Sequence, residues 1–455
     1  MSLSIIILAA GKGTRMNSAR PKVVHPLAGK PMLQRVVDTS RLLNPQQIIV
    51  VIGHGSEQVT GAVTDPDLLW VEQTEQLGTG HAVMQCNDLV TPGNDILVLY
   101  GDVPLISAST LQQLIAESEG TAVVCLLSFM AANPQGYGRI VRDATHHVQA
   151  IVEEKDASDE IRAIHESNSG ILLVSGNEYR TLLSELDNNN VQQEYYLTDV
   201  VKHAVARGHE VTAVICDDER EVLGVNNQVQ LAQLEAVYRE HQATQLMNLG
   251  VKLADPKRID VRGSLETGRD VSIDINCIFE GEVVLGDGVR VGANCVIRDS
   301  HIGEGSEILP MTMIDDSSIG ANNSIGPFAR IRPATVTDEQ AKIGNFVEIK
   351  KSAIGKGSKV SHLSYIGDTE MGSQVNIGAG TITCNYDGAN KHQTVIEDGV
   401  FVGSDTQLVA PVKVAKDSTI GAGSTITRDT PQGKLSLSRS KQLSIKGWQR
   451  PVKNR

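Results

Sequence analysis

Two glycines, a lysine and an arginine occur within nine residues in the stretch LAAGKGTRM, Leu8 to Met16. The short apolar run Leu3–Leu8 comes directly before it and predicts a buried strand. A glycine-rich turn at the carboxyl end of a first parallel strand brings backbone N–H groups close to phosphate oxygens. Arg15 and Lys22 add mobile positive charge nearby. The stretch could equally be a structural turn, because its spacing matches neither a P-loop nor a dinucleotide-binding fingerprint.

Asp102 is a second candidate for chemistry at the same edge of the predicted sheet. The apolar run ILVLYGDVP predicts a strand that ends in Tyr100, Gly101 and Asp102. A carboxylate just beyond a strand tip is a natural Mg²⁺ ligand, although it could also cap a following helix. The polar loop Gln73–Thr79 could read a nucleotide base, and Asn226 could add a neutral oxygen to the metal.

His362, in the segment VSHLSYIGD, could act as a general base, because histidine is suited to accept a proton near pH 7. An amino sugar that attacks a thioester needs such a base as the tetrahedral intermediate forms. The chain contains 12 histidines. A surface histidine without a function is therefore the better interpretation of His362 taken alone.

The elements that must hold the first group of residues alternate between strands and helices. Amphipathic stretches predict helices such as Met32–Leu43 and Ala108–Glu117. Apolar runs predict buried strands at Ser4–Leu8, Gln47–Ile52, Asp95–Tyr100, Ala122–Leu127, Ile171–Val174 and Val211–Ile215. This alternation predicts an α/β domain over residues 1–227 with a Rossmann-like, mostly parallel sheet.

A long polar helix is predicted next, over Gln228–Asn248. Its apolar residues recur at helical spacing, and it contains neither proline nor glycine. These features favour a rigid helical linker.

Residues 249–455 repeat a short pattern in which a small aliphatic residue precedes glycine, as in Leu285-Gly286, Ile302-Gly303 and Ile319-Gly320. Many of the intervals between such pairs are 6, 12 or 18 residues; others, including those between these three examples, are 11 or 17 and imply irregular corners or shortened faces. This pattern predicts a left-handed parallel β-helix, with the aliphatic residue inside and the glycine permitting a tight corner. The alternative interpretation is a glycine-rich linker, but a linker would have no reason to keep hydrophobic residues at regular spacing. The segment Asn385–Gln393 breaks the repeat, and we expect it to loop out.

Composition narrows the functional classes. The formal net charge of −13 over 455 residues argues against nucleic acid as a partner and leaves small anionic ligands possible. The sequence has no apolar run long enough for a membrane span. The six cysteines are scattered, so we expect neither a zinc site nor a disulfide framework. We therefore expect a cytoplasmic protein of two or three domains.

Three motifs of the first half together resemble the sugar-nucleotide pyrophosphorylases: LAAGKGTRM with Pro21-Lys22, QLGTGHA and YGD. With its helix and β-helix, the chain is similar end to end to the bacterial bifunctional N-acetylglucosamine-1-phosphate uridylyltransferase/glucosamine-1-phosphate N-acetyltransferases. The resemblance implies that the second half acetylates glucosamine 1-phosphate with acetyl-CoA. The first half would then transfer a uridylyl group from UTP and release pyrophosphate. The product, UDP-N-acetylglucosamine, is a precursor of peptidoglycan and lipopolysaccharide.

The resemblance also implies roles for residues of the first half that lie in matching motifs, among them GYGRI, IVEEKDA and GVNN. Asp102 and Asn226 would carry Mg²⁺. Arg15 and Lys22 would stabilise the phosphates during catalysis. The remaining nucleotide- and sugar-binding residues would be Leu8, Ala9, Ala10, Gly11, Gln73, Gly78, Thr79, Tyr100, Gly101, Gly138, Glu153 and Asn168.

In the second half, the resemblance implies that His362 is the base for acetyl transfer and that the β-helix forms a homotrimer. The sugar phosphate would contact Arg332, Lys350, Tyr365, Asn376, Asn385 and Tyr386. Acetyl-CoA would contact Ala379, Asn385, Tyr386, Ser404, Ala422 and Arg439. A basic tail could be a solvated end or could neutralise coenzyme A phosphates; its residues are Lys441, Lys446, Arg450, Lys453 and Arg455.

Three positions depart from the family's usual residues. Ser169 replaces a threonine, and Gln193 and Ala334 stand where glycine is common. Two rival interpretations remain open. A monofunctional nucleotidyltransferase with a regulatory β-helix, like ADP-glucose pyrophosphorylases, would give His362 no function. A non-catalytic assembly protein built from the same modules would be expected to lose Arg15, Lys22 or Asp102, and all three are present.

Overall fold

The computed structural model describes residues 2–118, 122–451 and 453, which divide into two compact units, Met1–Tyr238 and Arg239–Arg455. Arg455 of the basic tail lies outside the described residues. Within the described ranges, none of the helices combines the length and apolarity that a membrane crossing would require. All six cysteines have free thiols.

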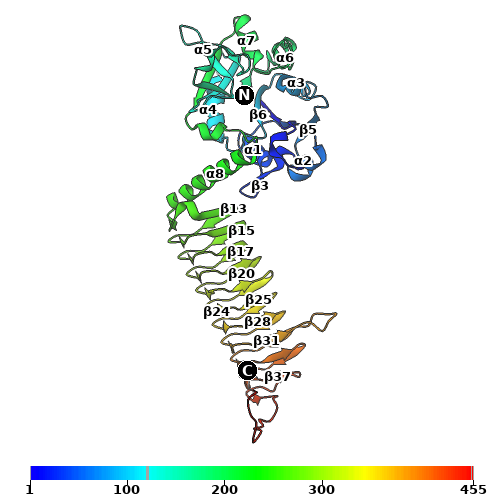
Figure 1. The fold of residues 1–455 in the computed structure, drawn as a ribbon, viewed down its shortest axis with the longest axis vertical. Coiled ribbons are helices and arrows are strands. Elements are labelled where there is room, and N and C mark those ends of the chain that lie inside the picture. The colour runs from blue at the N-terminus through cyan, green and yellow to red at the C-terminus, as the bar shows by residue number, and fades with distance from the viewer. Residues whose placement is uncertain (1, 119–121, 452, 454–455) are drawn as a thin grey trace. The chain divides into compact units, whose positions relative to one another are not determined.

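The first unit is built on a mixed sheet, and most neighbouring pairs along its main path from β11 to β5 are parallel, as predicted (Figure 1). The one central strand that runs antiparallel to both neighbours is β10. A small antiparallel hairpin, β8 (Arg139–Arg142) and β9 (Val148–Val152), extends from β10 and was not predicted. The strands, in spatial order, are β11 (Val211–Cys216), β7 (Val124–Met130), β10 (Glu166–Val174), β6 (Asp95–Tyr100), β1 (Leu3–Leu8), β4 (Gln47–Ile52) and β5 (Leu69–Glu72).

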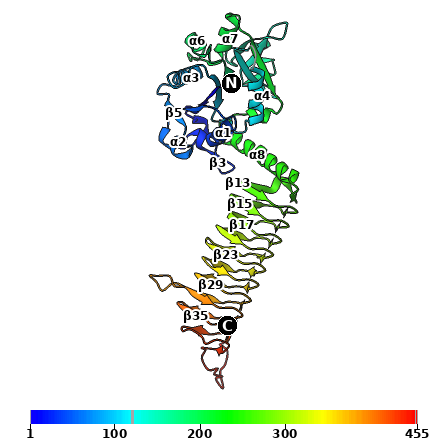
Figure 2. The same ribbon diagram turned by 180° about the vertical axis from the view of Figure 1, so that it is seen from behind.

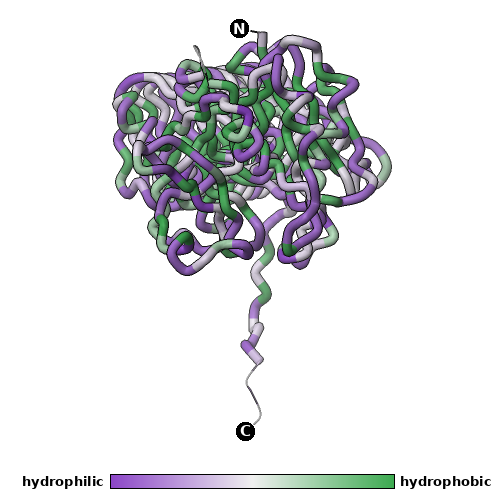
Figure 3. The backbone as a smooth tube through the Cα atoms, turned by 90° about the horizontal axis from the view of Figure 1, so that it is seen from above, coloured by the Kyte–Doolittle hydropathy of each residue, from purple (hydrophilic) through white to green (hydrophobic). Residues whose placement is uncertain are grey.

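Helices cover both faces of this sheet, because side chains of β1 alternate between two cores. Ile5 and Ile7 pack in one core, and Ile6 and Leu8 in the other. Residues of α1 and α4 belong to the first core, and those of α3, α6 and α7 to the second. The helices are α1 (Met32–Arg41), α2 (Ser56–Ala62), α3 (Thr79–Met84), α4 (Ala108–Ser118), α5 (Asp159–Arg162), α6 (Tyr179–Ser184) and α7 (Asp199–Ala206). Figure 3 colours the backbone by hydropathy and shows many purple, hydrophilic segments at the edge of the view. A two-stranded ribbon pairs β2 (Pro26–Leu27) with β3 (Lys30–Pro31).

Helix α8 spans Gln228–Asn248, which are the predicted bounds. Leu231 and Leu234 pack with residues of the first unit such as Met32. Ala243 and Leu246 belong to the core of the second unit. The division between the two units therefore falls inside this helix.

The second unit is a parallel β-helix with three strand-lined faces, seen from two sides in Figures 1 and 2. One face is a ladder of β12 (Lys252–Leu253), β14 (Ser272–Ile273), β16 (Arg290–Val291), β18 (Glu307–Ile308), β21 (Ser324–Ile325), β24 (Lys342–Asn345), β27 (Lys359–His362), β30 (Asn376–Ile377), β33 (Phe401–Val402), β36 (Thr419–Ile420) and β38 (Leu435–Ser436). The handedness of the β-helix stays a prediction.

The other two faces share long strands in the first coils, β13 (Ile259–Thr267), β15 (Cys277–Leu285) and β17 (Val296–Ile302), and then separate. One branch holds β19 (Met313–Asp315), β22 (Arg330–Ile331), β25 (Glu348–Lys350), β28 (Tyr365–Gly367), β31 (Ile382–Cys384), β34 (Gln407–Val409) and β37 (Thr425–Ile426). The other holds β20 (Ser317–Ile319), β23 (Thr335–Thr337), β26 (Ala353–Ile354), β29 (Thr369–Met371), β32 (Thr394–Ile396) and β35 (Val412–Val414).

The repeated aliphatic residues fill the core of the β-helix as predicted, but the predicted role of their glycines was wrong. Ile302 and Ile319 are fully buried. Among the described aliphatic–glycine pairs, only Gly326 has a positive φ. A Cβ at Gly303 would instead lie 2.6 Å from a carbonyl carbon of the next coil. Glycine is required there because successive coils approach closely, while other residues with positive φ, such as Asn294, form corners.

The segment Asn385–Gln393 leaves the β-helix as predicted. It connects β31 to β32 and forms one antiparallel bridge, between Tyr386 and Lys391. Figures 1 and 2 show this loop projecting from the coils. Its residues are therefore free to act at the surface of the β-helix without disturbing the ladder.

Candidate active sites

A cavity of about 290 Å³ opens at the carboxyl ends of β1 and β6 in the first unit. Leu8 and Tyr100 are paired at these two strand ends. The predicted nucleotide-binding residues that line the cavity are Leu8, Ala9, Ala10, Gly11, Lys22, Gln73, Gly78, Thr79, Tyr100 and Asp102. Val23, Gln76, Ala82 and Glu194 also line it. Predicted residues from three distant motifs thus meet at the edge where open α/β sheets bind ligands.

The glycines of the first loop have different tasks. A Cβ at Gly11 would meet no atom within 4 Å, so this side of the loop faces open space in the cavity. Gly13 has a φ of +60°, and a Cβ there would lie 2.7 Å from the Cβ of Lys22. Gly13 therefore lets the loop turn sharply and pack against the residue that carries the lysine ammonium.

The four residues predicted to handle phosphate and metal form one cluster. The Lys22 ammonium is paired with Oδ2 of Asp102 and donates to Oδ1 of Asn226 over 3.2 Å. Arg15 donates to the same Asn226 oxygen over 3.0 Å. Both Lys22 and Asp102 are largely buried. The cluster thus holds two cations beside two oxygen ligands, and its members Lys22 and Asp102 line the cavity.

This cluster is suited to Mg²⁺. The carboxylate of Asp102 and the amide oxygen of Asn226 converge on a single cation, the Lys22 ammonium. Across the described part of the chain, no group of three or more histidine, cysteine or acidic residues is arranged to hold a metal. Mg²⁺ commonly takes one or two protein oxygens and completes its shell with water and substrate phosphate. The residues present therefore fit a magnesium ion that arrives with a nucleotide.

Gln73 and Gly78 lie on the loop that covers the other side of the cavity. Gln73 donates to the carbonyl of Gly78 over 3.1 Å. Gly78 has a φ of +107°, and a Cβ there would lie 2.6 Å from the Tyr195 carbonyl oxygen. Gln76 was missed as a single residue, although its loop was identified. It joins this loop to the first one by donating to the carbonyl of Ala10 over 2.9 Å.

Gly138, Glu153 and Asn168 are brought together by the β8–β9 hairpin and β10. The N–H of Asn168 donates to the Gly138 carbonyl over 2.8 Å. A Cβ at Gly138 would lie 3.5 Å from either carboxylate oxygen of Glu153. These three residues, with Gly101, Arg15 and Asn226, do not line the cavity described above.

Burial shapes the ionisation of this second group. Desolvation raises the pKa of Glu153, and a hydrogen bond from Thr198 to its Oε1, over 3.1 Å, acts in the opposite direction. Burial also raises the pKa of Tyr100, helped by the negative charge of Glu153. The Tyr100 hydroxyl therefore stays protonated at neutral pH and can donate to a ligand.

In the β-helix, His362 and the predicted coenzyme A residues Ala379, Ser404 and Ala422 lie in one line along a corner, whereas Asn385 and Tyr386 belong to the projecting segment. Strand pairing places Ala379 on the coil after His362 and Ser404 on the next coil. Ala422 follows on the coil after that. Arg439 donates from its guanidinium to the Ala422 carbonyl over 3.0 Å. Asn376, in β30, is paired with Lys359 at the start of the His362 strand.

The predicted sugar-phosphate residues gather around the carboxylate of Asp368 on a neighbouring face. Lys350 lies 3.7 Å from Asp368, and Asn385 donates to it over 2.5 Å. Asn385 also lies 3.4 Å from the Tyr365 hydroxyl. Arg332 is one coil away and is paired with Glu348 at 2.7 Å.

Lys391, on the projecting loop, was not predicted and joins this group. Its contact with Lys350 lowers the pKa of Lys391, because two ammonium groups are close together. A cavity of about 510 Å³ is lined by Lys391, Lys351, Asp368 and Ala334. Two ammonium groups held this close together favour the binding of an anion between them. The signal in the sequence was a lysine inside the one segment that interrupts the repeat. Tyr386 of the same loop is exposed and donates to the Gly388 carbonyl.

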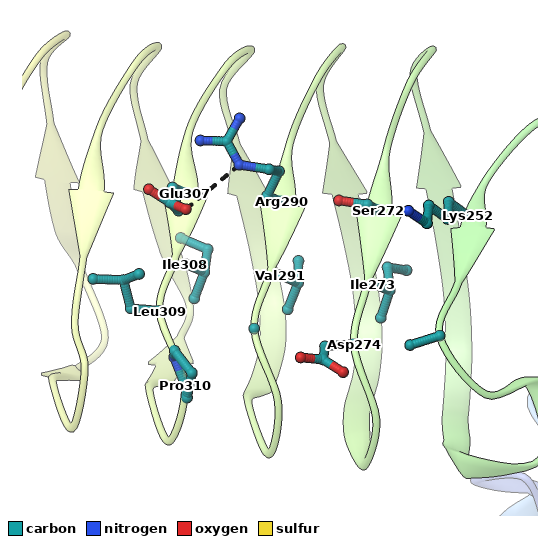
Figure 4. Close-up of a pocket in the computed structure, with 12 residues that line it drawn as sticks. Lys252, Ser272, Ile273, Asp274, Arg290, Val291, Glu307, Ile308, Leu309 and Pro310 are labelled. Carbon is teal, nitrogen blue, oxygen red and sulfur yellow. Dashed lines mark hydrogen bonds and ion pairs between the residues drawn. The ribbon is translucent and has the colours of Figure 1, made fainter.

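A groove of about 380 Å³ on the first coils contains none of the predicted residues (Figure 4). Its charged side chains partly neutralise one another, as Arg290 and Glu307 do at 3.4 Å. Nothing in its lining indicates chemistry.

Comparisons with known proteins cover both units. Residues 5–169 match the MobA-like NTP transferase domain, residues 261–344 the GMPPB C-terminal domain, and residues 393–428 the bacterial transferase hexapeptide family of six repeats. Among curated relatives, a "Bifunctional protein GlmU" of Nitrosospira multiformis is 57% identical over 452 residues, covering 99% of this chain and 98% of the relative. Proteins of the same name from Azoarcus sp. and Ralstonia nicotianae are 55% and 54% identical over 453 residues. These two alignments cover 100% of this chain, and 100% and 99% of the relatives.

Proposed function

The chain belongs to the GlmU family of bifunctional proteins, and on that premise we propose that it makes UDP-N-acetylglucosamine in two steps. Residues 249–455 acetylate glucosamine 1-phosphate, residues 1–227 couple the product to UTP, and α8 is the linker. The observation that carries this proposal is that each unit assembles its own set of reactive residues, around Asp102 and around His362. The free cysteines support a reducing compartment, the cytoplasm.

Uridylyl transfer needs no general base, because the attacking phosphate of N-acetylglucosamine 1-phosphate is already an anion. It attacks the α-phosphorus of UTP in line, and pyrophosphate leaves. Lys22 and Arg15 contribute by holding the phosphates and balancing their charge. Mg²⁺ held by Asp102 and Asn226 would supply further neutralisation of the phosphate charge. The Lys22 ammonium, which is paired with Asp102, also lines the cavity and would contact a phosphate oxygen there.

Acetyl transfer does need a base. His362 takes a proton from the sugar amine as its nitrogen attacks the thioester carbonyl of acetyl-CoA, and coenzyme A leaves. The backbone N–H of Ala379, one coil along the same corner, would donate to the developing oxyanion. Lys350, Arg332 and Lys391 hold the phosphate of the sugar. Ser404, Ala422 and Arg439 continue the line that coenzyme A follows.

A homotrimer is supported by a row of exposed apolar side chains along the same corner. Met311, Phe328, Phe346 and Leu363 each occupy one coil, have a positive φ and are 46–62% exposed. The rings of Phe328 and Phe346 stack with centroids 5.3 Å apart. A contiguous apolar row on a surface is typical of an interface. Light scattering of the purified protein should give three times the 48.9 kDa of one chain.

The decisive experiment supplies the purified protein with glucosamine 1-phosphate, acetyl-CoA, UTP and Mg²⁺. Both free coenzyme A and pyrophosphate should be released. No release of coenzyme A in this mixture, together with release of pyrophosphate from UTP when N-acetylglucosamine 1-phosphate is supplied instead, would support the alternative, a nucleotidyltransferase with a regulatory β-helix. Release of neither product would favour a non-catalytic assembly protein.

A further inference from the structure

We propose that Asn345 positions His362 for acetyl transfer by accepting a hydrogen bond from its Nδ1. Oδ1 of Asn345 lies 2.9 Å from Nδ1 of His362. The two residues are register partners at the ends of β24 and β27, on adjacent coils. The inference deepens the proposed acetyl-transfer function and depends on it.

The contact determines which imidazole nitrogen can act as the base. A neutral imidazole carries one N–H donor and one acceptor nitrogen. If Nδ1 donates to the amide oxygen, the proton-free nitrogen is Nε2, and that nitrogen takes the proton from the sugar amine. An amide oxygen also stabilises the imidazolium formed in that step without being protonated itself.

The surroundings make such a contact necessary. His362 is exposed within one chain, so packing inside that chain does not fix its ring. Asn345 is half-buried, and among the hydrogen bonds of the described residues it provides the side-chain partner of the His362 ring. The charged side chains on the two paired strands are Lys342 and Lys359, both exposed, so no carboxylate on these strands performs the same task.

The geometry also separates Asn345 from the substrates. His362 lies between Asn345 on the preceding coil and Ala379 on the following coil. The proposed coenzyme A line continues from Ala379 away from Asn345. Asn345 is thus placed to act through His362 rather than on the substrates.

Steady-state kinetics of acetyl transfer in Asn345→Ala and Asn345→Asp test the proposal. The alanine variant should lose roughly 10- to 100-fold in kcat, less than the 10²–10⁴-fold expected for loss of the base. The KM values for both substrates should not change. The aspartate variant keeps an acceptor and should recover most of the activity. Its carboxylate should also raise the pKa of the base and move the acid limb of the kcat/KM profile to higher pH.

Calorimetry of the same preparations, followed at the transition of the β-helix, reports whether that unit is folded in each variant, and uridylyl transfer reports on the other unit. Asn322→Gly is a matched control: it removes another β-helix asparagine at a corner whose φ of +56° suits glycine. A wild-type kcat in Asn345→Ala would overturn the proposal. So would an Asn345→Asp variant as impaired as the alanine variant, because the amide would then act as a donor. Absence of acetyl transfer in the wild-type protein would instead contradict the proposed function.

Discussion

The two units build their sites in opposite ways. In the α/β unit, Lys22 contacts Asp102 and Asn226, residues that are 80 and 204 positions away along the chain. In the β-helix, His362 contacts Asn345, and Asn385 contacts Asp368, each 17 positions away. The first site exists only when the whole sheet has formed, whereas the second needs a few neighbouring coils.

This difference affects how each site can be varied. At the sheet edge, one strand tip supplies both a cavity wall and a ligand, as Tyr100 and Asp102 do, so changes there are coupled. Along the β-helix, each coil contributes one position to a line and the next coil contributes another. Sites of this kind divide into separable parts, with the proton carrier on one coil and its positioning residue on the preceding one. If the two sites are built in these different ways, substitutions in one unit should leave the activity of the other unchanged.

The largest expected effect is the loss of one activity without the other. Asp102→Ala should abolish Mg²⁺-dependent formation of UDP-N-acetylglucosamine, because it removes the only carboxylate that the Lys22 cluster contains. Acetyl transfer should be intact. Coupled assays of pyrophosphate and coenzyme A release measure both activities in one preparation. Asp38→Ala removes a comparable lysine-paired aspartate, from an exposed pair at 2.6 Å, and should change neither. Normal uridylyl transfer by Asp102→Ala would reject the metal assignment.

The reciprocal change is His362→Ala. It should lower kcat for acetyl transfer by roughly 10²–10⁴-fold, the usual contribution of a general base. Uridylyl transfer from N-acetylglucosamine 1-phosphate should be unaffected. His301→Ala, another exposed histidine of the β-helix, provides the control. A near-normal acetylation rate in His362→Ala would show that His362 is not the base. The contrast between the sites of the two units would then no longer hold.

The sequence predicted those parts of each unit that rest on local pattern. Strand tips, the bounds of α8 and the buried aliphatic residues of the coils follow from periodicity and composition. The antiparallel direction of β10 did not follow, because an apolar run carries no information about its orientation. The β8–β9 hairpin was missed because its strands are short and half-exposed.

Within the sites, the missed residues are those that act through tertiary contacts. Gln76 matters because it joins two loops, and Asn345 because it lies on the coil before His362. Neither residue type is informative alone. The sequence showed the aliphatic–glycine pairs but not why glycine is needed in them. At Gly303 it is needed because successive coils approach closely, and not because φ is positive. Such a distance is visible only once two coils are stacked.

A smaller effect is expected at the projecting loop. Lys391→Ala should raise KM for glucosamine 1-phosphate roughly tenfold, because it removes one charge-assisted hydrogen bond to the phosphate. The kcat for acetyl transfer should change little, since Lys391 holds the phosphate and not the reacting amine. Lys413→Ala removes an exposed lysine paired with Glu397 at 2.6 Å and serves as the control. If kcat in Lys391→Ala fell by as large a factor as KM rose, the loop would contribute to the reaction step itself and not only to phosphate binding.

The smallest effect concerns one position in each unit that departs from the expected glycine. Gln193 has a φ of +55° and Ala334 a φ of +60°, conformations that cost a residue with a Cβ about 1–2 kcal/mol. Substitution by glycine would remove that cost. It would also lower the free energy of unfolding by about 0.5–1 kcal/mol, because glycine gives the unfolded chain more conformational freedom. Gln193→Gly should therefore stabilise the α/β unit, and Ala334→Gly the β-helix, each by well under about 2 kcal/mol. Calorimetry would follow the transition of each unit, with Gln192→Gly, at a residue without a positive φ, as the control. If either substitution shifted both transitions, the units would not be energetically independent, and the separation of their sites would not extend to their stability.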